Sequence, residues 1–165
     1  RLADFYDNLS AIAPVIVGSI VDTNNFLGSI EHNWTDLGKI FDKEEAFAEA
    51  YNNVVNRVTE LKSKVEEDGS KALILLHNRG RFSAYGSGSR FGIIHDVMGV
   101  KEAEEGLGTH VHGNPVSSEY VQKVNPDIIF IVDRSMVVGN EVLDKESVEN
   151  MLIKQTSASI NNRII

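Results

Sequence analysis

A glycine- and serine-rich stretch, Gly-Ser-Gly-Ser-Arg-Phe at positions 86–91, contains the first side chain that could bind a ligand, Arg90. Ser89 and Arg90 stand directly before a segment with helical spacing, where a serine can cap the helix and the first amides attract anions. An arginine at that place indicates a binding site for an anion. The glycine spacing, G-x-G-x-x-x-G, matches neither the dinucleotide-binding fingerprint nor a phosphate-binding loop. A tight turn with a solvated arginine is the alternative interpretation.

Two histidines separated by one residue, in Thr-His-Val-His at 109–112, form the second candidate. In an extended segment His110 and His112 would face the same side, which is a common arrangement of metal ligands. The chain contains no cysteine and no matching carboxylate is evident, so a histidine-bearing surface loop is the alternative. His77, at the end of an apolar run, and His95, within a helical pattern, are expected to have packing or capping roles.

The third candidate is Arg134, which follows Asp133 at the end of the apolar run 128–132. Ligands of open α/β sheets bind at the carboxyl ends of the strands, so this position favours a binding role. A surface salt bridge with Asp133 or Glu119 is the alternative interpretation. No set of nucleophile, base and acid can be assembled from the three candidate motifs, and the pattern therefore favours binding over catalysis.

Hydrophobic periodicity predicts the elements that position these residues. Apolar residues recur at intervals of three and four from position 34 to about 67, with a break at 42–45, and indicate one long helix from Glu44 that ends at Gly69. Beyond it, apolar strands alternate with helical patterns, as expected for an α/β fold whose sheet is covered on both faces. The predicted strands are 15–17, 72–77, 81–85 and 128–133, and the other predicted helices are 3–12, 89–98, 117–124 and 145–154.

Composition and charge exclude several classes of protein. The formal charge of −8 argues against a nucleic-acid binder, which needs a concentrated basic face. The longest apolar runs have the length of strands, so no segment is expected to span a membrane. Glu102, Glu104 and Glu105 form an acidic run that is interpreted as a solvated face. The chain begins at Arg1 without an initiator methionine or signal peptide and ends two residues into an apolar run, so we expect a fragment.

Three motifs are distinctive in their order and spacing: Ser-Arg-Phe-Gly-Ile-Ile-His-Asp-Val at 89–97, Thr-His-Val-His-Gly at 109–113 and Asn-Pro-Asp-Ile-Ile-Phe-Ile-Val-Asp-Arg at 125–134. They resemble the substrate-binding proteins of ferric-siderophore ABC transporters, in the branch that takes catecholate siderophores. The resemblance implies the second α/β lobe of a two-lobed periplasmic-binding-protein fold with a long inter-lobe helix. Residues 1–42 would then be a remnant of the first lobe, 43–68 the connecting helix, and 69–165 the second lobe, truncated at its carboxyl end.

The resemblance also implies which residues line the cleft between the lobes. Arg1, which precedes a Phe-Tyr-Asp motif, would be the first-lobe arginine, and Arg90 and Arg134 the second-lobe arginines. His112 would complete the coordination of iron when the siderophore supplies only two catechols. Arginine forks suit the anionic charge of a ferric catecholate, and Fe(III), a hard ion, suits catecholate oxygens and imidazole. Asp4 stands where the family often has a lysine, which lowers the positive field of the cleft.

The implied function is the capture of a ferric catecholate siderophore outside the cytoplasm, by a periplasmic protein or a cell-surface lipoprotein. Delivery to the membrane permease of an ABC transporter would follow, with no catalysis and no intrinsic cofactor, since Fe(III) arrives within the siderophore complex. A haem or cobalamin binder on the same fold is one alternative, although its cleft would be more apolar and have fewer arginines. A metallohydrolase that uses His110 and His112 is another, and it would need a carboxylate ligand and an open water position.

Overall fold

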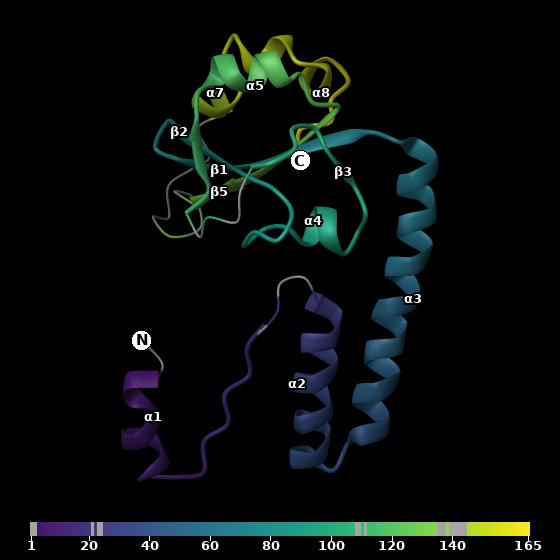
Figure 1. Ribbon diagram of the computed structural model, residues 1–165, viewed down its shortest axis with the longest axis vertical. Helices are drawn as coiled ribbons and strands as arrows, with labels where there is room; N and C mark the ends of the chain where they lie inside the picture. Colours follow the sequence, from purple (N-terminus) through teal and green to yellow (C-terminus); the bar gives the residue numbers. More distant parts are fainter. Residues whose placement is uncertain are drawn as a thin grey trace.

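A sheet-based lobe and a long helix, α3, dominate the computed structural model, and two shorter helices lie at the end of α3 that is farther from the sheet (Figure 1). These are α1 (Ala3–Ser10) and α2 (Phe26–Phe41). α2 packs beside α3, where the rings of Trp34 and Phe47 meet edge to face at 6.3 Å. The structure describes residues 3–20, 22, 25–107, 110, 112–134, 138 and 145–165.

The long helix α3 (Glu44–Asp68) has the bounds that the periodicity predicts. Asp42 ends the preceding helix in a left-handed conformation with φ 56°, and Gly69 ends α3 in the same way with φ 68°. The predicted break at 42–45 and the predicted end at Gly69 are therefore confirmed. No helix in the described part of the chain combines the length and the apolar character that a bilayer crossing needs.

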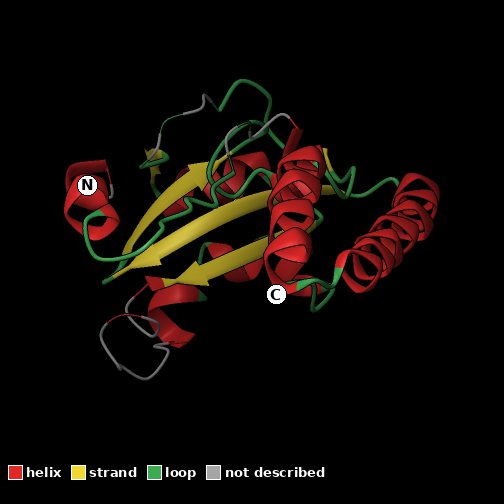
Figure 2. Ribbon diagram, turned by 90° about the horizontal axis from the view of Figure 1, so that it is seen from below, coloured by secondary structure: helices red, strands yellow, loops and turns green. Residues whose placement is uncertain are grey.

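The lobe is built on a five-stranded sheet with β1 at its centre. β1 pairs antiparallel with β2 and parallel with β5, and its first residues also pair parallel with β3, while β4 continues the sheet beyond β2. The longer strands lie side by side in Figure 2. Near the chain end Ile164 forms a parallel bridge with Ile129 of β5. The strands are β1 (Lys71–Asn78), β2 (Arg81–Tyr85), β3 (Lys101–Glu102), β4 (Asn114–Val116) and β5 (Ile128–Asp133).

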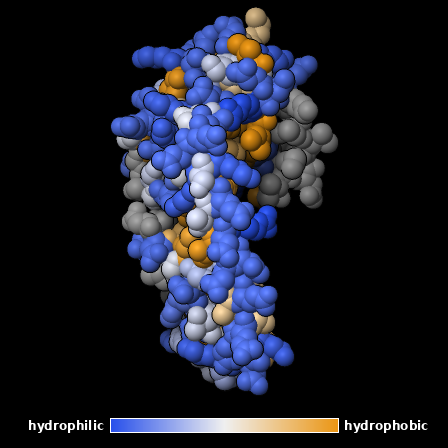
Figure 3. Space-filling model, turned by 90° about the vertical axis from the view of Figure 1, so that its right-hand side faces the viewer, coloured by the Kyte–Doolittle hydropathy of each residue, from blue (hydrophilic) through white to orange (hydrophobic). Residues whose placement is uncertain are grey.

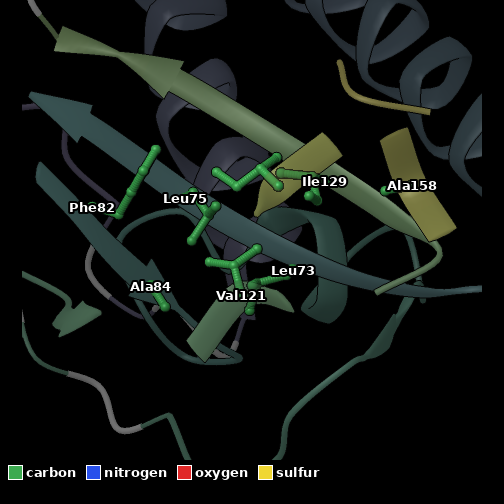
Figure 4. Close-up of a cluster of buried hydrophobic side chains, with 8 residues drawn as sticks. Leu73, Leu75, Phe82, Ala84, Val121, Ile129 and Ala158 are labelled. Atoms are coloured by element: carbon green, nitrogen blue, oxygen red, sulfur yellow. The ribbon is translucent and has the colours of Figure 1, made fainter. Parts of the chain in front are cut away.

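Helices cover both faces of the sheet, as the continuous apolar strands predict (Figure 1). On one face, side chains of β1, β2 and β5 gather with Val121 of α5 (Ser118–Val124) and Ala158 of α8 (Ser157–Ile160), as Figure 4 shows. On the other face α3 and α4 (Ile93–Asp96) contribute Val65 and Ile94 to a second apolar cluster. Each fully buried leucine or isoleucine contributes about 1.5–3 kcal/mol to this packing. The α/β fold class is confirmed.

Three predicted elements differ from the structure. The segment 15–17 has no partner strand among the described residues, and a strand needs the hydrogen bonds of a neighbour. The predicted helix 145–154 is divided into α7 (Lys145–Val148) and the 3₁₀ turn η2 (Ile153–Gln155), because the side chain of Asn150 accepts from the amides of Leu152 and Ile153 and starts a new turn. The predicted helix 89–98 is reduced to the four residues of α4.

Candidate functional site

The turn that carries Arg90 connects β2 to α4, and the amides of Ser87, Gly88 and Ser89 in it have acceptors within the chain. The amide of Ser87 donates to Glu102 Oε1 and the amide of Gly88 donates to Asp96 Oδ2, each at 2.7 Å. The amide of Ser89 donates to the carbonyl of Gly86 at 3.3 Å. The expectation that Ser89 caps a helix is wrong, because its buried Oγ has no hydrogen-bond partner among the described residues and α4 begins only at Ile93.

Two glycines of this turn make room for the carboxylates. A methyl group at Gly86 would lie 2.5 Å from Glu102 Oε1, and one at Gly92 would collide with Asp96 Oδ2. Carboxylates from two different elements thus determine where glycine is needed. Sequence reasoning missed both acids, and it placed Glu102 in a solvated acidic run, whereas only Glu104 and Glu105 of that run are exposed.

The side chain of Arg90 is exposed and stands beside an aromatic pair. Its guanidinium lies 5.0 Å from the centre of the Phe91 ring, and Phe91 meets Tyr85 edge to face at 4.8 Å. Burial raises the pKa of the Tyr85 phenol, and the charge of Arg90 partly offsets this effect. No carboxylate among the described residues forms an ion pair with Arg90.

The loop that carries His112 packs against the same tyrosine. Gly113 lies so close to the Tyr85 ring that a methyl group at Gly113 would be 2.6 Å from Tyr85 Cε2. The amide of Gly113 donates to the carbonyl of His110 at 2.9 Å, and His110 and His112 are both exposed. Tyr85 therefore brings the Arg90 turn and the His112 loop together.

The structure leaves the predicted metal role of His112 untested. Thr109 and Val111 lie outside the described residues. The expectation that the imidazoles of His110 and His112 face the same side depends on this segment and also lies outside the described residues. Within the described ranges no three His, Cys, Asp or Glu side chains come together to hold a metal ion.

Arg134 comes from a different part of the lobe, directly after the carboxyl end of β5, and it is exposed. The preceding Asp133 is buried and accepts from His77 Nδ1 at 2.8 Å, while His77 Nε2 accepts from the amide of Gly80 at 2.9 Å. These bonds place the proton of a neutral imidazole on Nδ1. The packing role expected for His77 takes the form of a buried pair with Asp133, which sequence reasoning missed because the residues are 56 positions apart.

Two other candidates are simpler to place. His95 is buried and its Nδ1 bonds the carbonyl of Val100 at 2.8 Å, which confirms a structural role. Arg1, the predicted first-lobe arginine, lies outside the described residues.

An apolar groove of about 380 Å³ lies between α3 and the sheet, and its lining does not include Arg90, His112 or Arg134. Figure 3 shows this side of the molecule as mostly hydrophilic, with a few small apolar patches between the polar side chains. Charged side chains stand at its rim, where Arg163 donates to Asp68 at 3.1 Å. The apolar lining of the groove consists of Leu61, Val65, Met98, Val100, Ile128 and Phe130.

Comparison with known proteins gives a consistent result. A model of the family "Periplasmic binding protein" matches residues 1–165. The petrobactin-binding protein YclQ of Bacillus subtilis is 36% identical over 165 residues, which cover 100% of this chain and 52% of that protein. The ferric-anguibactin-binding protein FatB of Vibrio anguillarum is 38% identical over 168 residues, which cover 99% of this chain and 52% of that protein. The chain thus spans about half the length of the curated relatives it matches.

Solved structures show the same relationship. The crystal structure of YclQ superposes with a TM-score of 0.93 at 35% identity, and covers 100% of this chain and 57% of the YclQ chain. The periplasmic catecholate-siderophore binding protein VctP of Vibrio cholerae gives a TM-score of 0.90 at 29% identity, over 99% of this chain and 59% of the VctP chain. The resemblance seen in the motifs is confirmed, and the haem, cobalamin and hydrolase alternatives are not favoured.

Proposed function

The chain belongs to the periplasmic binding protein family, and we propose that it is part of a protein that captures a ferric catecholate siderophore outside the cytoplasm and delivers it to the permease of an ABC transporter. Two curated relatives are named for the siderophores petrobactin and anguibactin. A solved relative is named for catecholate siderophores. The proposed activity is binding and transfer, without catalysis.

The observation that carries the proposal is the exposed, unneutralised Arg90 beside the His112 loop. A ferric catecholate keeps a net negative charge, and an arginine fork bonds its oxygens while it offsets that charge. An overall charge of −8 would otherwise repel such a ligand. Local arginines are therefore the means by which this acidic chain would hold an anion.

His112 has a separate role in the proposal. A siderophore with two catechols leaves two positions of six-coordinate iron open, and an exposed imidazole supplies a nitrogen ligand. Fe(III) is part of the cargo and not a resident cofactor. Arg134, and Arg1 from the first lobe, would add positive charge around the same ligand.

The domain division belongs to the proposal as well. Residues 69–165 would form the second lobe, 43–68 the connecting helix and 1–42 a remnant of the first lobe, with the ligand held between the lobes. The lobe built on β1 to β5 and the single helix α3 agree with this division. Outside the cytoplasm, the protein would lie either in the periplasm or at the cell surface as a lipoprotein.

A fluorescence-quenching titration with a ferric bis-catecholate tests the function, run on this chain and on the longer protein in which the proposal places it. Tight binding by the longer protein and weaker binding by the chain are expected, because half of the cleft is missing from the chain. Haem and cobalamin serve as competing ligands. No binding of the ferric catecholate by either protein, or tighter binding of haem, would overturn the proposal.

The variant Arg90→Ala and a matched variant Arg57→Ala complete the test. Arg57 is an exposed arginine on α3, so its removal changes the net charge by the same amount. We expect only Arg90→Ala to weaken binding. Equal losses in the two variants would reduce the role of Arg90 to a general charge effect.

A further inference from the structure

Two carboxylates hold the turn that carries Arg90, and neither of them pairs with the arginine. Glu102 belongs to β3 and Asp96 to α4, and each accepts one amide of the turn at 2.7 Å. Hydrogen bonds to an ionised acceptor are about twice as strong as neutral ones. The turn is therefore fastened from two sides by strong bonds.

The glycines of the turn point to the same arrangement independently. Gly86 and Gly92 stand where any larger residue would displace the carboxylate of Glu102 or of Asp96. Both glycines thus allow a carboxylate to approach the backbone. A turn built only to reverse the chain would not need this approach at two positions.

We propose that Asp96 and Glu102 are positioning residues for Arg90, an inference that rests on the proposed role of Arg90 in ligand binding. The two carboxylates fix the backbone on the amino-terminal side of Arg90, and each accepts a backbone amide of the turn instead of pairing with the guanidinium. The guanidinium forms no ion pair with any carboxylate in the part of the chain that the structure describes, and it lies over the Phe91 ring. The turn thereby holds Arg90 in place without cancelling its charge.

Glu102 also connects the Arg90 turn to the segment that leads to His112. The next residue, Ala103, donates its amide to the carbonyl of Ala72 at 2.9 Å and anchors this segment to β1. Farther on, Leu107 lies against Gly86, 3.1 Å from the position that a methyl group would take. A change at Glu102 would therefore loosen the Arg90 turn where the two segments meet.

The test compares substitutions that keep an acceptor oxygen with substitutions that remove it. Glu102→Gln and Asp96→Asn keep a carbonyl oxygen for the amide, whereas Glu102→Ala and Asp96→Ala do not. Binding of a ferric bis-catecholate is measured in the longer protein, with Glu105→Ala as control because Glu105 is an exposed acid of the same run. We expect roughly tenfold or greater weakening in the alanine variants, as for loss of a charged hydrogen bond, and about threefold or less in the others.

A double-mutant cycle separates positioning from a general loss of structure. In an Arg90→Ala background, Glu102→Ala should cost no further affinity, because the residue it positions is gone. In an Arg134→Ala background its cost should remain in full. Additive losses with Arg90→Ala, or amide variants as weak as the alanine variants, would overturn the positioning role. If Asp96→Ala fails to fold, the Glu102 variants carry the test.

A measurement without ligand distinguishes failure of this inference from failure of the proposed function. The Arg90 side-chain protons lie near the face of Phe91 and should show a ring-current shift in NMR spectra, and the Ser87 and Gly88 amides should exchange slowly with solvent. Glu102→Ala should reduce the shift and speed the exchange of Ser87. If Glu102→Ala changes the ring-current shift and the exchange rate in this way but no ferric catecholate binds, the proposed function is wrong, while the positioning of Arg90 by Glu102 is supported. Unchanged signals in Glu102→Ala overturn the positioning.

Discussion

Two regions of the lobe use carboxylates in different ways. Around Tyr85, the carboxylates of Asp96 and Glu102 bond backbone amides, and a basic side chain beside them stays exposed. At the carboxyl end of β5, the carboxylate of Asp133 bonds the imidazole of His77, and both side chains are buried. Burial decides the difference, because a buried ionised group needs a partner while an exposed one can leave its charge to a ligand. The first region is thus suited to binding and the second to stability.

The largest expected effect comes from breaking the buried pair. Asp133→Ala removes the carboxylate that accepts from His77 Nδ1, in a site where the His77 side chain is 3% exposed, and should lower the free energy of unfolding by up to about 3 kcal/mol. Urea unfolding followed by circular dichroism measures this change. Asp133→Asn, which keeps an acceptor oxygen, is the matched control and should cost clearly less. If Asp133→Ala lowers the free energy of unfolding by less than about 1 kcal/mol, the His77–Asp133 pair does not have the stabilising role that distinguishes it from the Arg90 turn.

Arg90→Ala should show the opposite behaviour to Asp133→Ala. Because the side chain is exposed, the unfolding free energy should change by less than about 0.5 kcal/mol. Affinity for a ferric catecholate should fall by about 1.5–3 kcal/mol, the range of a hydrogen bond to a charged group. Paired urea and binding titrations on one preparation check both values. A stability loss as large as that of Asp133→Ala would show that Arg90 belongs to the scaffold.

His112→Ala should affect ligands selectively. Loss of an iron ligand should weaken a two-catechol complex by about 1.4 kcal/mol, or tenfold, and leave a three-catechol complex unaffected because its iron is already saturated. The two titrations are compared at one pH, with His32→Ala as control, since His32 is an exposed histidine on α2. Equal losses for both ligands would exclude iron coordination by His112.

The smallest effect is expected at an exposed carboxylate where α3 meets the lobe. Hydrogen bonds from Ser70 and then from Arg163 hold the pKa of Asp68 below its usual value. The folded pKa is below the unfolded one, so this contribution to stability is present at neutral pH and is lost as the pH falls through the folded pKa. The unfolding free energy of Asp68→Asn should therefore depend less on pH between about 5 and 2 than that of the wild type. Identical pH profiles would contradict the role of these bonds.

Local sequence predicts much of the lobe because its elements are continuous patterns. The bounds of α3 and the positions of β1, β2, α5 and β5 follow from apolar spacing and capping residues, and the structure agrees with them. Residues 89–92, which the spacing predicts as the first turn of a helix, belong instead to the turn before α4, and one carboxylate that holds this turn, Glu102, is 15 positions from the amide of Ser87 that it bonds. Nothing in the local pattern shows such a partner.

The candidate site could be predicted only as separate residues. Motif resemblance selected Arg90, His112 and Arg134, but their setting depends on contacts between distant segments, such as Tyr85 with Gly113. The His77–Asp133 pair follows from the register of β1 against β5, which places these residues opposite each other. The sequence alone does not give this register, so it predicts two strands with polar ends but no bond between His77 and Asp133. The role of Arg1 and the division into lobes stay predictions.

The helix α3 is one continuous rigid connection between α2 and the sheet. It contains neither glycine nor proline from Glu44 to Asp68, and at 1.5 Å per residue it spans about 37 Å. Sharp kinks of helices occur mostly at proline or glycine, so α3 lacks the residues at which it would bend easily. Any change in the angle between the sheet lobe and α2 is therefore concentrated at the residues that flank α3, Asp42 and Gly69, which both have a left-handed backbone conformation.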